Sequence, residues 1–119
     1  MRKIIVIAGI AALGAAPAAL AKERNISMIG APMAPMAGQA WTATIAVKMD
    51  GRYTIGKAPA VRIVSRVGTV LTVLSMPTRR AGVYRARLTF PSAGTWRVLV
   101  VDRETGRSYE FRRMSVRAT

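Results

Sequence analysis

The sequence predicts an all-β fold, an antiparallel β-sandwich of about seven strands. Three features of its 119 residues lead to this prediction. Apolar and polar residues alternate with a period of two in several segments. Gly, Pro and Asp turn signals separate these segments at intervals of roughly 8–12 residues. No long window has the i, i+3, i+4, i+7 spacing of an amphipathic helix, so a parallel sheet with crossover helices is not expected.

The first 21 residues have the pattern of a secretory signal peptide. The basic pair Arg2-Lys3 precedes an apolar stretch that ends in the small-residue sequence Ala19-Leu20-Ala21. We therefore expect cleavage after Ala21, a mature domain over residues 22–119, and export to the periplasm or the extracellular space. The alternative is an uncleaved segment, because the apolar stretch is at the lower limit for spanning a bilayer. Such a segment would be the only expected contact with a membrane.

The first half of the mature domain is expected to contain two strands. Residues 24–30 form a short strand, and the APMAPMAG segment after it forms an extended edge segment or a loop because its prolines lack backbone donors. Residues 41–49 alternate regularly, and Asp50-Gly51 predicts a turn after them. The predicted inward side chains of this strand are Trp41, Ala43, Ile45, Val47 and Met49.

Three further strands are expected in the middle of the chain. One spans about 60–67, where Val61, Ile63 and Val67 alternate with arginines. Residues 69–76 are apolar on both faces, which predicts a buried strand or part of an adjacent ribbon. The third strand begins after Gly82, and its predicted inward side chains are Tyr84, Ala86, Leu88 and Phe90.

The last two strands are expected to form a hairpin. The TWRVLVVD segment alternates, and the DRETGR turn after it contains Gly106, which suits a left-handed backbone conformation. The final strand spans about 108–116 and changes phase between Phe111 and Met114. This change predicts a β-bulge near Arg112-Arg113.

The segment GVYRARLTFPSAGTWRVLVV, residues 82–101, resembles the signature of the YtkA-like domains. The residues that carry the resemblance are Gly82, Tyr84, Phe90, Pro91, Gly94 and Trp96. These domains are small exported or membrane-anchored immunoglobulin-like sandwiches of bacteria, similar in shape to the FixH and CopC groups. The resemblance covers roughly residues 41–101 and implies an immunoglobulin-like sandwich. CopC-like copper proteins bind Cu(II) through His, which this chain lacks.

The composition excludes many kinds of site. The chain contains no Cys and no His, so disulfides, thiolate zinc sites and Ser-His-Asp or Cys-His catalysis are impossible. With only five acids, a carboxylate-rich Ca²⁺ or Mg²⁺ site is not expected, and Asp102 and Glu104 are expected to hydrogen-bond within a turn. We therefore expect neither an enzyme nor a cofactor.

The chain has 19 Lys and Arg against 5 Asp and Glu, a formal net charge of +14. Guanidinium groups bind phosphate and carboxylate groups through paired hydrogen bonds. We expect a basic outer sheet face to engage an anionic envelope component or an acidic protein, whereas nucleic acid should bind only without sequence specificity. The alternative is a structural module with solvated arginines and no ligand. The predicted contact residues are Arg62, Arg66, Arg85, Arg87 and Arg97, and the pairs Arg79-Arg80 and Arg112-Arg113 add to the charge.

A second functional hypothesis rests on three methionines, Met28, Met33 and Met36. Thioethers are soft ligands that suit Cu(I), and the Met33-x-x-Met36 spacing brings two sulfurs within reach of one ion. This hypothesis makes the protein a Cu(I) carrier or metallochaperone. The competing interpretation is that Met28 packs in the core and the other two cover an edge of the sandwich.

Overall fold

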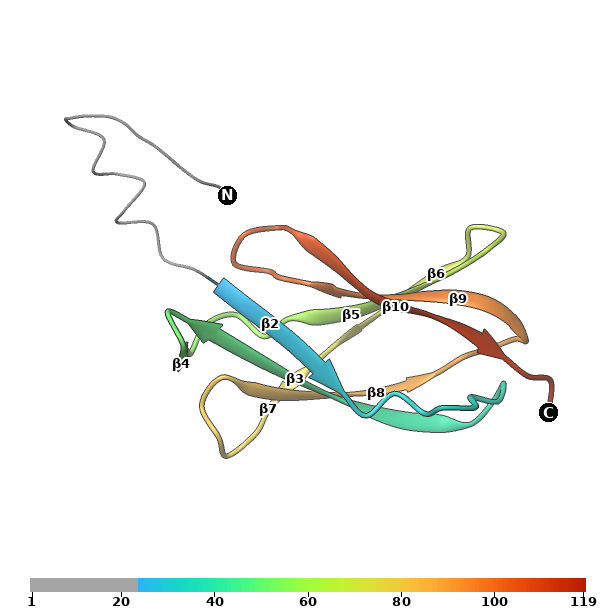
Figure 1. Cartoon of the computed structure of the whole chain (residues 1–119), viewed down its shortest axis with the longest axis horizontal. Helices are drawn as coiled ribbons and strands as arrows, with labels where there is room; N and C mark the ends of the chain where they lie inside the picture. Colours follow the sequence, from blue (N-terminus) through green and yellow to red (C-terminus); the bar gives the residue numbers. More distant parts are fainter. Residues whose placement is uncertain (1–23) are drawn as a thin grey trace.

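Two antiparallel sheets pack face to face in the computed structural model, which describes residues 24–119 (Figure 1). The first sheet has the order β2-β3-β8-β7, with β4 paired to β3, and the second has the order β10-β9-β5-β6. These strands are β2 (Arg24–Ile29), β3 (Ala40–Met49), β4 (Arg52–Tyr53), β5 (Ala60–Ser65), β6 (Val70–Leu74), β7 (Met76–Pro77), β8 (Val83–Thr89), β9 (Gly94–Val101) and β10 (Ser108–Val116).

The strand order is that of an immunoglobulin-like sandwich. The first sheet corresponds to strands A-B-E-D, and the second corresponds to G-F-C with an additional strand, β6, beside C. The prediction of an all-β, immunoglobulin-like sandwich is therefore confirmed.

The predicted signal peptide, residues 1–21, lies outside the described residues. Within the described part of the chain, no helix has the length and apolar character needed to cross a bilayer.

The core lies between the two sheets, where the alternating strands place their apolar side chains. Trp41, Phe90 and Trp96 form its aromatic centre, with the Phe90 ring centroid 5.9 Å from each tryptophan ring centroid. The Trp96 indole N–H donates to the Ser92 carbonyl at 2.9 Å, which satisfies its polar atom. The predicted inward residues of β3 and β8 are buried, apart from the half-buried Met49 at the end of β3. The alternation in β9 likewise buries Trp96, Val98 and Val100.

The predicted turns and the bulge are also present. Asp50 and Gly51 have positive φ angles of 53° and 78°, as a two-residue hairpin turn requires. The register between β10 and β9 shifts between Glu110 and Arg112, which confirms the predicted bulge. Asp102 accepts a hydrogen bond from the Glu104 N–H at 3.0 Å, so this acid does stabilise its own turn. The prediction is wrong for the Glu104 carboxylate, which accepts from the Lys57 N–H of another loop at 2.6 Å.

Two predictions in the middle of the chain are wrong. Val67 is 90% exposed because β5 ends at Ser65 and a turn follows. Of the two alternatives for residues 69–76, the buried strand is wrong. Val70–Leu74 forms β6, which pairs with the neighbouring β5 as the ribbon alternative expected, but as an exposed edge of the second sheet, and Met76 then joins β7 in the first sheet. Apolar residues on both faces of this segment indicated burial, but an edge strand without a neighbour leaves them in solvent.

The chain crosses between the sheets at Ser75, which is 1% exposed. Its backbone N–H and its hydroxyl both donate to the Pro59 carbonyl, at 3.0 and 2.5 Å. These two bonds hold the end of β6 against the start of β5. A second connection between the sheets is ionic. Arg24 of β2 forms a bidentate pair with Asp102, after β9, at 2.7 and 2.9 Å.

Candidate anion-binding face

The five predicted contact arginines lie on opposite faces of the sandwich. Arg85 and Arg87 lie at exposed positions of β8 in the first sheet. Arg62 and Arg97 lie on β5 and β9 in the second sheet, and Arg66 follows the end of β5. A single flat partner surface therefore cannot contact all five, and the predicted contact set divides into two smaller sets.

On the second sheet, two of the three predicted arginines, Arg62 and Arg97, have side-chain partners. The Arg97 Nε donates to Glu110 at 2.6 Å, and Arg113 donates to the other oxygen of the same carboxylate at 3.3 Å. Arg62 donates to the Thr72 hydroxyl at 3.2 Å. Arg66, Arg97 and Arg113 line a shallow depression on this face, but Glu110 neutralises part of its charge.

Glu110 is ionised more readily than an ordinary glutamate. The hydrogen bond from Arg97 lowers the pKa of Glu110 below its usual value of 4.5, and the charges of Arg97 and Arg113 add to this effect. Partial desolvation opposes the shift but does not cancel it. Near neutral pH the carboxylate is therefore negative and competes with any external anion for these two arginines.

On the first sheet, the arginines of β8 have no such partner. No hydrogen bond or ion pair joins Arg85 or Arg87 to another side chain among residues 24–119. Threonines of β3 lie directly across from them, since Arg85 pairs with Thr44 and Arg87 pairs with Thr42. Residues 51–101, which include the loop before β8 and all of β8, contain neither Asp nor Glu. The four acids among residues 24–119 lie outside that range.

The loop before β8 brings two more arginines to the same face. The Thr78 hydroxyl donates to the Val83 carbonyl at 2.9 Å and accepts from the Arg80 N–H at 3.1 Å, which closes the loop around Arg79 and Arg80. Gly82 ends the loop with a φ of 78°, and a Cβ there would lie 2.9 Å from the Val47 carbonyl oxygen. This position requires glycine, and the conformation of Gly82 determines the direction in which the loop enters β8.

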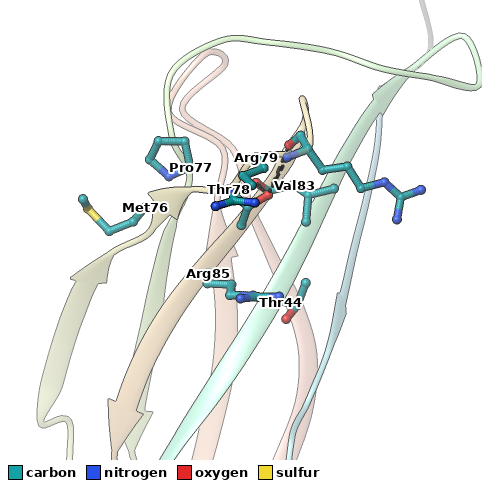
Figure 2. A pocket seen from close by; sticks show the side chains of 8 residues that line it. Thr44, Met76, Pro77, Thr78, Arg79, Val83 and Arg85 are labelled. Atoms are coloured by element: carbon teal, nitrogen blue, oxygen red, sulfur yellow. Dashed lines mark hydrogen bonds between the residues drawn. The ribbon is translucent and has the colours of Figure 1, made fainter.

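Together, the loop and the strands line an open pocket with three arginines (Figure 2). We call it the arginine pocket. Arg85 and Thr44 lie side by side on its floor, with Arg79 and Thr78 above them in Figure 2. Its residues are Thr44, Met76, Pro77, Thr78, Arg79, Arg80, Val83 and Arg85. Guanidinium and hydroxyl donors without a competing carboxylate favour an anionic ligand.

An exposed aromatic ring continues the basic surface beside the arginine pocket. The Arg80 guanidinium carbon lies 5.1 Å from the Tyr53 ring centroid, and the Lys48 Nζ lies 4.7 Å from it. Both distances fall within the range of cation–π attraction. The ring holds two cations in place while their charges stay accessible to solvent.

The methionines of the copper hypothesis occupy different environments. Met28 packs against the core from β2, whereas Met33 is 99% exposed and Met36 is half-buried. A side chain as exposed as Met33 contacts almost nothing, so its sulfur does not adjoin that of Met28. Across residues 24–119, no group of three or more carboxylates, cysteines or histidines could hold a metal ion.

Sequence reasoning identified Arg85 and Arg87 but did not place the Arg79-Arg80 loop beside them. The missing information was the pairing of β7 with β8, where Met76 lies opposite Arg85. Residues 51–101 contain no acid, but this range also includes β5 and β9 of the second sheet, so that sequence signal does not distinguish the two faces.

No family model matches the chain, and no curated protein matches its sequence. The resemblance to the YtkA-like domains therefore stays a prediction that rests on residues 82–101.

Proposed function

We propose that the protein is an exported, non-catalytic binding module of the bacterial envelope, YtkA-like in type, whose first sheet engages an anionic partner. One observation carries the choice of face: Arg79, Arg85 and Arg87 have no acidic partner within the described residues, whereas Glu110 pairs with Arg97 and Arg113 on the opposite face. Export rests on the signal-peptide pattern at the N-terminus.

The mechanism is direct contact between guanidinium groups and phosphate or carboxylate groups. Arg85 and Arg87 are two residues apart on one strand, so their Cα atoms are about 7 Å apart on the same face. Two anionic groups at that spacing on a polymer or on a protein surface can be bound at once. The net charge of the chain adds a longer-range attraction that accelerates the encounter and weakens as salt rises.

The test uses matched charge reversals on the two faces. Arg85→Glu/Arg87→Glu changes the first sheet, and Arg62→Glu/Arg66→Glu changes the net charge equally on the second. Binding of the full chain to inorganic polyphosphate is measured at two salt concentrations. We expect the first variant to weaken binding about tenfold or more and the second to weaken it less than about threefold.

Equal losses in both variants would contradict the proposal, because net charge alone would then account for binding. No binding by the unaltered chain would favour a structural module without a ligand.

A further inference from the structure

The edge of the second sheet formed by β6 is uncovered. β6 pairs with β5 on one side, and no described strand pairs with its other side. Val70 and Leu74 are each 53% exposed, and Leu71 is 40% exposed. Exposed edges are usually protected by charged side chains, proline or a bulge, because bare edges pair with other chains. The sequence VLTVL contains none of these protections.

The register of β6 shows which backbone groups face outward. The Ser65 backbone N–H donates to the Thr69 carbonyl, and the Ser75 backbone N–H donates to the Pro59 carbonyl. The residues of β6 that form hydrogen-bonded pairs with β5 are therefore the odd-numbered ones. In an antiparallel pair, the residues between them direct their N–H and C=O groups away from the partner strand. The outward-facing backbone groups therefore belong to Val70, Thr72 and Leu74, a row that can bond an added strand.

The charge around this edge selects among possible added strands. Arg62 lies opposite Thr72, Arg66 lies in the turn before β6, and Met76 after β6 lies opposite Arg85. No acid occurs anywhere between residues 51 and 101. A second copy of the chain would bring the same excess of positive charge to the edge, whereas an acidic segment would be attracted to both of its ends.

We propose that the β6 edge accepts an extended acidic polypeptide segment as an additional strand of the second sheet. Apolar side chains of that segment contact Val70 and Leu74, and its backbone bonds the outward groups of β6. Met76 is two residues, about 7 Å, beyond Leu74 and borders the arginine pocket. Carboxylates that follow the paired region therefore enter that pocket, so this part of the inference rests on the proposed function.

The experiment measures binding of the full chain to a synthetic peptide, Asp-Asp-Val-Thr-Val-Thr-Val-Asp-Asp. Two control peptides replace either all aspartates by lysine or both threonines by proline. Thr72→Pro removes an outward N–H at an edge position where proline is tolerated, and Thr72→Val is the matched control that keeps the N–H. Leu74→Asp tests the same edge by charge repulsion, so the inference stays testable if Thr72→Pro does not fold.

We expect Thr72→Pro and Leu74→Asp to weaken binding of the acidic peptide about tenfold or more, and Thr72→Val to change it less than about twofold. Both control peptides should bind about tenfold more weakly. Polyphosphate binding should be unchanged in Thr72→Pro. This result would separate peptide binding at the β6 edge from anion binding by the arginines of the first sheet.

Three results would overturn the inference. Equal affinity of the acidic peptide for Thr72→Pro and the unaltered chain would show that the edge is not used, even if Arg85→Glu/Arg87→Glu loses polyphosphate as the proposed function expects. Equal affinity for the acidic and lysine peptides would remove the charge selection. Sedimentation that shows a dimer, lost in Thr72→Pro, would identify a second copy as the occupant. If Arg85→Glu/Arg87→Glu binds polyphosphate normally while Thr72→Pro loses the peptide, the proposed function fails and the edge stands.

Discussion

The two outer faces of this sandwich carry the same kind of residue in two different electrostatic states. On the second sheet, Glu110 lies between Arg97 and Arg113 and satisfies both. On the first sheet, Arg85 and Arg87 lie across from threonines and have no acidic partner among residues 24–119. A charge count of the sequence treats these arginines alike. Their neighbours across the strands decide which of them stabilise the fold and which remain accessible to a ligand.

The comparison predicts the largest loss of stability at Arg24, the arginine with the most buried partner. Its side chain is 16% exposed, and that of Asp102 is 2% exposed. Arg24→Ala would leave the Asp102 charge buried without its guanidinium, so we expect the free energy of unfolding to fall by about 3 kcal/mol. Chemical denaturation measures this change. A loss no greater than that of an exposed arginine would show that the pair does not hold the sheets together.

A smaller effect is expected at Glu110, and it depends on pH. Because the folded state lowers the pKa of Glu110, this group contributes stability above its unfolded pKa, near 4.5, and loses that contribution as pH falls through the lower folded value. The melting temperature of the unaltered chain should therefore decrease more between pH 6 and pH 3 than that of Glu110→Gln. Parallel decreases in the two proteins would mean that the Arg97 and Arg113 contacts add nothing in solution.

The smallest effects on stability are expected on the first sheet. Among residues 24–119, Arg85→Ala and Arg87→Ala remove no side-chain hydrogen bond or ion pair, so each should change the free energy of unfolding by less than about 0.5 kcal/mol. The same variants should weaken polyphosphate binding. A stability loss similar to that of Arg24→Ala would contradict the distinction between the two faces, because these arginines would then be part of the structure itself.

Much of the fold could be predicted from local patterns. Period-two alternation identified the buried side of β3, β8 and β9, and the phase change at the end of the chain located the bulge in β10. Local patterns did not predict whether a whole strand is covered by its neighbours. The apolar sequence of β6 indicated a covered strand, but burial depends on whether another strand lies beside it, and that is a property of topology.

The candidate site was predictable only in part for the same reason. Arg85 and Arg87 follow from alternation on one strand, whereas their separation from Arg62 and Arg97 follows from the assignment of β8 and β5 to different sheets. Nothing in the local sequence determines which strands are neighbours. The pairing of β7 with β8, which completes the arginine pocket, depends on the chain changing sheets after only one residue.

The position of Ser75 between the two sheets also affects how the domain unfolds. The continuous segment from β6 through β7 is a member of both sheets, and the two hydrogen bonds to Pro59 fasten it at the crossing. Separating the sheets would stretch this segment and break those bonds, so we expect the two sheets to open together. The Ser75 amide should accordingly be among the slowest in the chain to exchange its hydrogen for deuterium, at a rate set by opening of the whole domain.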